Sequence, residues 1–367
     1  MATQNLNSPQ ASRQAFFNGE MLSHVVPQEV IGKCCRGMKK SLPRNQTDTI
    51  KFRRYLPKGA TVNTPNTWNV QPASHLLSEG ETPIAETLIA QDITAQLQQY
   101  GLLYRYSDKQ YDMHQDDIPS EMVKQTGERM GLLIEMIRYG VLRAGTNIFR
   151  AGLVASRNLI VGRVSGITLR SIARTLQSNL SKKVSSILPA SAGVETHPVE
   201  AAYVVVHHSN VSADIRSQLT LGEGFIHVSA YAQRQVIHEN ELGSWEEFRF
   251  VASPHLDPYL LAGGTTAGAN TVLANGVPNS AGTEAADVYP LLVLTEEAYG
   301  DVMLRGMNAI QAYHRKPGGG EGMNSSPDDP LGQRGHVGAK TYFTAVRLNE
   351  LQMAVYEVAV GALVSAA

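Results

Sequence analysis

The chain has 367 residues, 43% of them hydrophobic, an ordinary content for one large globular domain or two coupled domains. A formal charge of −1 at pH 7 excludes a strong overall attraction to nucleic acid or to a membrane surface. The opening residues carry no basic start followed by an apolar core, and no stretch is apolar enough to cross a membrane, so we expect a soluble chain without a secretion signal. The two cysteines, Cys34 and Cys35, are adjacent, which favours reduced thiols over a disulfide framework or a metal site.

Residues 1 to about 50 are rich in Gln, Asn, Ser and Pro without a sustained period, which predicts an extended or partly disordered arm. From residue 33 to residue 58 the charge is strongly positive, with Asp48 as the one acidic residue. The basic residues are Lys33, Arg36, Lys39, Lys40, Arg44, Lys51, Arg53, Arg54 and Lys58. This pattern indicates either a solvated basic tail or an arm that lies on the acidic surface of a neighbour or faces a polyanion.

Two strands and a long intervening loop are predicted next. Apolar and polar residues alternate over 49–57 and again over 91–98, which is typical of strands, and Pro57, Gly59, Pro65 and Pro72 punctuate the segment between them. After Gln99 the alternation slips by one residue. Because such a slip moves side chains to the opposite face, we predict a bulge or a change of packing partner near residues 98–101.

A long helix is predicted from about Ile118 to Gly145. Asp116 or Asp117 provides an N-cap, Pro119 suits the first turn, and apolar residues recur at helical spacing up to residue 141. Such a helix is about 38 Å long, enough to form a spine across a domain. A weaker helical pattern covers residues 167–180.

The rest of the chain combines short strands with long loops. Apolar runs at 201–209, 248–253 and 288–295 predict strands, and a last pattern of this kind covers 342–360. Loops rich in glycine are predicted over 261–287 and 315–335. Loops this long count against a self-contained enzyme unless they are functional or lie on a partner.

The search for catalytic chemistry assigns no catalytic residue, no cofactor-binding residue and no metal ligand. A phosphate-binding loop is absent, the zinc-protease motif fails because Leu242 stands where a second histidine is required, and His207 and His208 face opposite sides of one strand. One acidic cluster could bind a hard cation or could simply cap the long helix: Asp108, Asp112, Asp116 and Asp117, beside His114. The residues therefore favour a structural protein rather than an enzyme, with a metal-dependent enzyme that uses the Asp108–Asp117 cluster as the alternative.

Several blocks carry a family resemblance. SEGETP (78–83), QDITAQLQQYG (91–101), YSDKQYDMHQDD (106–117) and LRAGTN (142–147) resemble, in order and spacing, the major capsid proteins of a podophage-type family of tailed bacteriophages. The blocks at 241–253, 287–300 and 335–350 also resemble that family, and TIKFRRYLP (49–57) resembles its entry segment. Ala339 stands where the family block has an aromatic residue, and the arm before Thr49 matches no family block.

The resemblance implies the α+β Hong Kong 97-type major capsid protein fold. It implies an N-terminal arm over 1–48 and an extended β-hairpin loop over 49–98 that reaches over a neighbour. A peripheral domain would comprise 99–196 and 335–367, with its spine helix at about 118–145, and an axial domain would comprise 197–334. The same fold is used by encapsulin-type compartments, but the sequence blocks favour the virus.

The function that the resemblance implies is self-assembly through hexamers and pentamers into an icosahedral shell that encloses double-stranded DNA in the virion. Assembly would take place in the host cytoplasm with a separate scaffold, a portal and, in some shells, a decoration protein, with non-specific DNA contacts and no membrane. Candidate inter-subunit contacts are Arg53, Arg54, Lys58, Glu79 and Glu81, and the candidate basic arm comprises Lys33, Arg36, Lys39, Lys40 and Arg44. Each of these charges is also compatible with ordinary surface charge.

Overall fold

A computed structural model describes residues 29–34, 38–56, 72–77, 79–80, 82, 88–114, 117–187, 197–220, 224–230, 236–265, 273–274, 277–278, 285–304, 311–317, 329 and 332–361. The chain forms two compact units. Of the described residues, the smaller unit contains those between 103 and 128 and between 312 and 338, and the larger unit contains all the others. Among the described residues, no helix combines the length and the apolar character needed to span a membrane.

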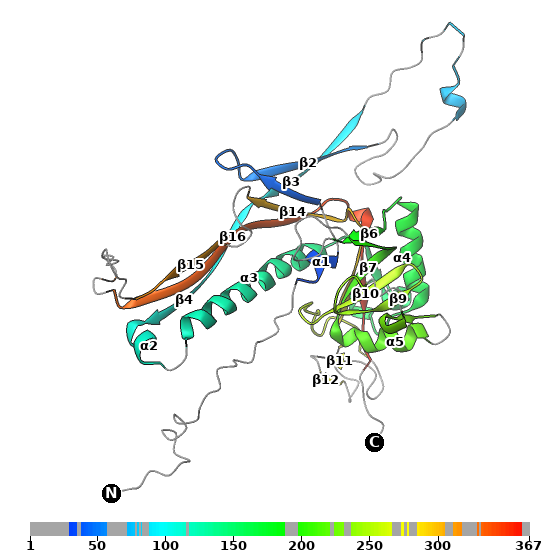
Figure 1. Cartoon of the computed structure of the whole chain (residues 1–367). Coiled ribbons are helices and arrows are strands. Elements are labelled where there is room, and N and C mark those ends of the chain that lie inside the picture. Colours follow the sequence, from blue (N-terminus) through cyan, green and yellow to red (C-terminus); the bar gives the residue numbers. More distant parts are fainter. Residues whose placement is uncertain are drawn as a thin grey trace, which may run out of the picture. The chain divides into compact units, whose positions relative to one another are not determined.

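The larger unit is built on an eight-stranded sheet in the order β5-β17-β13-β7-β10-β9-β8, with β6 paired to β7 (Figure 1). The pairs β7–β10 and β5–β17 are parallel, whereas β7–β13 and β13–β17 are antiparallel. The strands are β5 (Ile148–Arg150), β6 (Val184–Ile187), β7 (His197–His208), β8 (Ile226–His227), β9 (Glu241–Trp245), β10 (Phe248–Ser253), β13 (Tyr289–Leu294) and β17 (Met353–Val358).

Both faces of this sheet are buried, which explains the continuous apolar runs in the sequence. Side chains alternate along β7: Tyr203 and Val205 join one core cluster, and Val204 and Val206 join another. The first cluster also contains apolar residues of α4 (Gly166–Ser178) and α5 (Ser212–Thr220), and the second contains Tyr139 from the long helix α3 (Ile118–Arg143). The strands predicted at 201–209, 248–253 and 288–295 are therefore confirmed as core strands.

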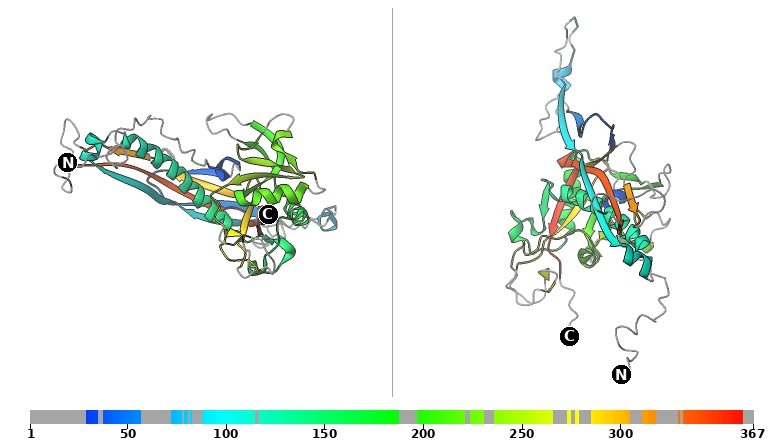
Figure 2. Two further views of the ribbon diagram at one scale, coloured as in Figure 1. Left: turned by 90° about the horizontal axis from the view of Figure 1, so that it is seen from below. Right: turned by 90° about the vertical axis from the view of Figure 1, so that its left-hand side faces the viewer.

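A second group of strands lies in the larger unit beside α3. There β14 (Tyr299–Leu304) pairs with β1 (Met38–Leu42) and with β16 (Arg334–Arg347). Ile134 of α3 packs against Phe343 and Ala345 of β16, so helix and strand lie side by side in this unit, as the left view of Figure 2 shows. The predicted spine-length helix is present and spans 26 residues, about 39 Å.

The antiparallel pair β2 (Thr49–Leu56) and β3 (Ile89–Gln96) confirms the two strands predicted around the long loop. Its inner residues Phe52 and Ala95 pack with Leu42 and Val302 in a small separate core. After β3 the chain changes partner, because β4 (Gln98–Ser107) pairs with β16 instead of β2. The slip in alternation near residue 98 is thus a change of packing partner, as predicted.

The remaining described elements are short. Helices α1 (Ile31–Cys34) and α2 (Asp108–Met113) were not predicted, and β15 (Gln311–Arg315), β11 (Leu273–Ala274) and β12 (Val277–Pro278) lie in or beside predicted loops. Six short 3-10 helices occupy Pro72–His75, Ala151–Leu153, Arg157–Leu159, Ser209–Val211, Val228–Ala230 and Glu350–Gln352 in the described part of the chain.

The described part of the predicted arm differs from the expectation of an extended or disordered segment. Val30, Ile31 and Cys34 are fully buried in the core of the larger unit, and β1 pairs with β14 in parallel. The polar composition of the first fifty residues concealed these few apolar side chains, whose partners lie far along the chain. Residues 1–28 lie outside the described residues.

Candidate assembly contacts

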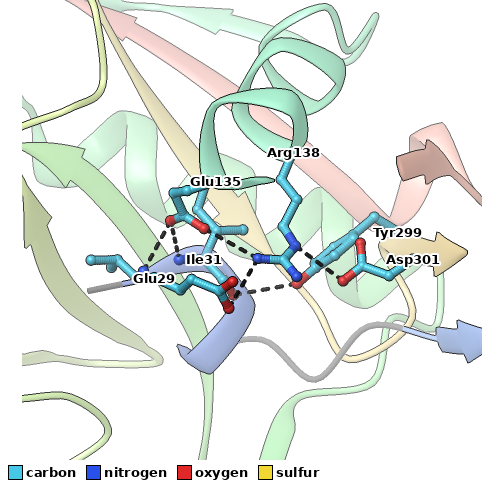
Figure 3. Close-up of polar contacts among 7 residues, drawn as sticks. Glu29, Ile31, Glu135, Arg138, Tyr299 and Asp301 are labelled. Atoms are coloured by element: carbon cyan, nitrogen blue, oxygen red, sulfur yellow. Dashed lines mark hydrogen bonds and ion pairs between the residues drawn. The ribbon is translucent and has the colours of Figure 1, made fainter. Parts of the chain in front are cut away.

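A buried group of charges attaches the segment before α1 to the long helix (Figure 3). Arg138 of α3, only 2% exposed, lies at the centre. Its Nη1 is 3.2 Å from Glu29 Oε2 and 3.5 Å from Glu135 Oε2, and its Nε donates to Asp301 Oδ2 at 3.0 Å. Helical spacing places Glu135 and Arg138 on one face of α3, and β14 supplies Asp301. Glu29, Glu135, Arg138 and Asp301 are called the Arg138 cluster below.

The Arg138 cluster also holds the backbone of the segment. Glu135 Oε1 accepts hydrogen bonds from the N–H groups of Val30 at 3.0 Å and Ile31 at 2.6 Å, and the Tyr299 hydroxyl donates to the Ile31 carbonyl at 3.3 Å (Figure 3). A Cβ added at Gly32 would lie 2.4 Å from Arg138 Nη1, so the close approach requires glycine there. Both side-chain and backbone contacts therefore hold residues 29–31 against α3 and β14.

Burial disfavours the charged form of two carboxyl groups of the cluster, Glu135 and Asp301. It raises the pKa of Glu135, against the opposing effects of the Ile31 N–H and of Arg138. It likewise raises the pKa of Asp301, whose Oδ1 is buried without a hydrogen-bond partner, although Arg138 favours its charged form. Three carboxyl groups thus surround one guanidinium, an arrangement in which losing the cation is costly.

The β2–β3 pair carries the predicted contact residues Arg53 and Arg54. Arg53 forms a two-pronged ion pair with Asp92 across the strands, Nε to Oδ1 at 2.7 Å and Nη2 to Oδ2 at 2.8 Å. The hydrogen bonds from Arg53 lower the pKa of Asp92. Arg54 donates from Nη2 to Gln91 Oε1 at 2.8 Å, while its Nε and Nη1 are buried without a hydrogen-bond partner. Arg53 therefore already has a carboxylate partner, Asp92, within one copy of the chain.

A pocket of about 660 Å³ opens beside this strand pair. Its lining combines four basic residues with one carboxylate and several apolar side chains. An anionic group with some apolar surface would suit it best. The charged lining residues are Lys40, Lys51, Arg53, Arg54 and Glu297, and the apolar ones include Ile50, Phe52, Ile93 and Leu348.

The other predicted contact residues are dispersed. Lys39 and Lys40 are exposed on β1, Arg44 is exposed in the turn that follows, and Lys33 is half-buried on α1. Glu79 is exposed beyond β2. The remaining three, Arg36, Lys58 and Glu81, lie outside the described residues.

The acidic alternative site gains no support. Asp117 accepts hydrogen bonds from the Ser120 N–H and hydroxyl, as a helix cap does, and Ser107 caps α2. Within the described residues, no three His, Cys, Asp or Glu side chains are grouped so that they could hold a metal ion. Asp116 is not among those residues.

The histidine and cysteine candidates are part of the core. His207 is fully buried, and burial lowers its pKa to about 4, which keeps the ring neutral. Glu241, which lies within the His238–Leu242 stretch that fails as a zinc motif, accepts a hydrogen bond from Arg249, Nε to Oε1 at 2.7 Å. Cys34 is fully buried in the second core cluster. These side chains therefore belong to the packed interior of the larger unit.

Sequence reasoning missed the Arg138 cluster. The one local signal is a Glu-x-x-Arg pair, Glu135 and Arg138, on the otherwise apolar face of the long helix. An ionisable pair at core positions predicts partners elsewhere, but the sequence does not say that Glu29 and Asp301 supply them.

The chain matches no protein-family model, and no curated protein is significantly similar to it in sequence. Solved structures do match it over almost its whole length. The capsid of Ralstonia phage GP4 gives a TM-score of 0.65 at 9% identity, with 100% of both chains covered. The capsid asymmetric unit of cyanophage Pam1 gives a TM-score of 0.59 at 12% identity and covers 97% of this chain and 100% of that chain.

The capsid structure of cyanophage P-SCSP1u gives a TM-score of 0.58 at 13% identity and covers 98% of this chain and 97% of that chain. Identities this low establish the fold. The mixed helices and strands described above agree with it. The chain therefore has the α+β Hong Kong 97-type fold predicted from its sequence, the fold of phage capsid subunits.

Proposed function

We propose that the chain is the major capsid protein of a tailed bacteriophage, which assembles through hexamers and pentamers into an icosahedral shell around double-stranded DNA. One observation carries the proposal: the chain matches capsid subunits of several phages from end to end, with TM-scores up to 0.65. The role is structural, with no catalytic residue, cofactor or metal assigned.

The proposal divides the chain by analogy with such subunits. Residues 1–48 form the N-terminal arm, 49–98 the extended loop, 99–196 and 335–367 the peripheral domain with α3 as its spine, and 197–334 the axial domain. The exposed side chains of Leu76 and Leu77 support the assignment of the loop. A single copy leaves these leucines in water, whereas a neighbouring copy would cover them.

Charged contacts between copies are proposed at Arg53, Arg54, Lys58, Glu79 and Glu81, and along the basic arm. The excess of basic residues in the lining of the pocket beside β2 supports a role for this region in binding acidic groups of a neighbour. Because Arg53 already pairs with Asp92, Arg54 is the stronger candidate of the two arginines.

The proposal extends to partners and location. The shell would assemble in the host cytoplasm, with a separate scaffold, a portal and, in some shells, a decoration protein. The net charge of −1 agrees with non-specific contacts to packaged DNA rather than with tight binding by every subunit.

Sedimentation velocity of the purified chain over rising concentration tests the proposal. Discrete species of five or six copies, followed by much larger particles, are expected. A chain that stays monomeric at every concentration, also when co-expressed with the scaffold gene of its own genome, would contradict it.

A further inference from the structure

The pocket beside β2 contains an arginine whose hydrogen-bonding capacity is not used within one copy of the chain. Arg54 Nη2 donates to Gln91 Oε1 at 2.8 Å, whereas Nε and Nη1 are buried and have no hydrogen-bond partner among the described residues. Buried donors without an acceptor are unfavourable, and a guanidinium pairs strongly with the oxygens of a carboxylate. A carboxylate that enters the pocket would supply the missing acceptor.

The charges around the pocket remain positive when its neighbours are counted. Three ion pairs at or beside the pocket cancel in charge: Arg53 with Asp92, Lys182 with Glu297, and Arg347 with Glu350. The lining then keeps Lys40, Lys51 and Arg54 as cations. Outside the lining, Glu296 and Asp48 oppose them, so cations are still in excess. Of the three lining cations, Arg54 is the least exposed to water, which makes an anionic partner most valuable there.

Apolar side chains form the other part of the lining. Ile50, Ile93 and Leu348 are only partly buried, and they pack at the edge of the small core that contains Phe52. The pocket volume of about 660 Å³ is in the range of pockets that hold a ligand. The occupant that fits this lining therefore places a carboxylate beside aliphatic side chains.

The sequence separates acidic from basic residues in this part of the chain. Residues 33–58 contain nine lysines and arginines and one acidic residue, whereas residues 59–104 contain four acidic residues and no lysine or arginine. The four are Glu79, Glu81, Glu86 and Asp92, of which Asp92 is bound by Arg53. The acidic stretch therefore complements the basic residues of the pocket.

Three described residues of the acidic stretch combine the two properties that the pocket requires. Leu76 and Leu77 are 83% and 70% exposed, and Glu79, two positions after Leu77, is exposed as well. Burial within their own copy therefore does not explain the two leucines. Leu76, Leu77 and Glu79 are called the loop group.

We propose that the pocket beside β2 binds the loop group of a second copy, an inference that rests on the proposed assembly function. Glu79 of the second copy accepts from Arg54, and its two leucines cover the apolar part of the lining. The pocket and the loop group are different surfaces, so the contact is heterologous, and repeated copies close into rings or a shell rather than into an isolated dimer.

Charge reversal tests the pairing. Glu79→Arg and Arg54→Glu should each raise the concentration needed for assembly by about tenfold or more, because each brings like charges together. A chain with both substitutions restores opposite charges and should assemble at nearly the wild-type concentration. Glu239→Arg and Arg105→Glu, which reverse exposed charges outside the pocket, are the controls and should change assembly much less. Sedimentation velocity measures all of these chains.

A neutral variant separates binding from folding. Arg54→Gln removes the buried N–H groups that lack an acceptor, so the melting temperature of the subunit should stay equal or rise while assembly weakens. A lower melting temperature together with unchanged assembly would show that Arg54 acts within its own copy and would overturn the proposal.

A mixture of the Arg54→Glu chain and the Glu79→Arg chain identifies the copy that supplies the loop group. If the contact joins two copies, rings of six with alternating chains form in the mixture, although neither chain assembles alone at that concentration. If the loop group binds the pocket of its own copy, both chains stay mispaired in the mixture. Recovery by the doubly substituted chain without recovery by the mixture would therefore overturn the proposed partner.

The outcomes separate this inference from the proposed function. Wild-type shells together with normal assembly of both single reversals would overturn the inference and leave the capsid role intact. A wild-type chain that never assembles would overturn both. Loss of assembly in each single reversal and its recovery in the mixture would support the pairing.

Discussion

Arg138 of α3 holds the segment that begins at Glu29 against the core of the larger unit. Three carboxyl groups approach its guanidinium, and the side chain is 2% exposed. Water cannot replace a partner lost at such a site, so each remaining charge would be left buried and unpaired. The exposed Arg53–Asp92 pair has similar distances, but solvent would compensate its loss.

Replacing Arg138 with methionine should lower the free energy of unfolding by about 3–5 kcal/mol, because two buried carboxyl groups lose their cation. Denaturant unfolding of the subunit measures the change. Arg53→Met, which shortens and neutralises an exposed arginine in the same way, should cause a much smaller loss. Equal losses of unfolding free energy in the two variants would contradict the idea that burial makes the Arg138 cluster more costly to break than the exposed Arg53–Asp92 pair.

The raised pKa of Glu135 predicts a pH dependence with a definite sign. Because the pKa of Glu135 is higher in the folded chain than in the unfolded chain, the folded chain binds more protons. The contribution of Glu135 to stability is therefore fully present below the unfolded pKa and is lost as the pH rises through the folded pKa. Glu135→Gln keeps an oxygen for the Val30 and Ile31 N–H groups and removes the titration. The advantage of the wild type over this variant should therefore grow as the pH falls from about 7 to about 5.

Unfolding free energies of both chains across that pH range provide the measurement. The exposed Glu239→Gln serves as the control for removing one negative charge. An advantage of the wild type that shrinks on acidification would contradict the assignment of Glu135 as a carboxyl group with a raised pKa.

At the scale of elements, the spacing of apolar residues predicted the helices and strands whose pattern is set by residues close together in the sequence. The long helix, the β2–β3 pair and the change of partner near residue 98 follow from the spacing of nearby apolar residues. The α1 and β1 elements could not be predicted this way. Val30 is bonded to a residue 105 positions away, and Asp301 meets Arg138 across 163 positions. Contacts of that range leave no local pattern, which is also why the candidate site was missed.

Two truncated chains test how far the fold extends into the predicted arm. A chain that begins at Arg44 lacks the buried Val30, Ile31 and Cys34 as well as β1, whereas a chain that begins at Glu29 keeps them. Each fully buried aliphatic side chain contributes about 1.5–3 kcal/mol, so the shorter chain should lose several kcal/mol relative to the longer one or fail to fold. Equal melting temperatures would show that these elements are dispensable.

At the scale of the whole molecule, the subunit leaves surfaces that a solitary protein rarely keeps. Leu76 and Leu77 are exposed beyond β2, and a pocket lined by four basic residues lies beside the strand pair. Many modest contacts of this kind can add across a shell to a stability that no single pair provides. The sequence predicted the fold class through its family-like blocks. The pocket beside β2 could not be predicted, because its lining residues come from segments far apart in the chain, such as Lys40, Glu297 and Leu348.

Electron microscopy of the purified, concentrated chain tests the central claim most directly. The account predicts rings of five or six subunits and closed or spiral shells. Uniform small particles from the wild type, both alone and co-expressed with the scaffold gene of its own genome, would contradict the proposal that this chain builds a capsid.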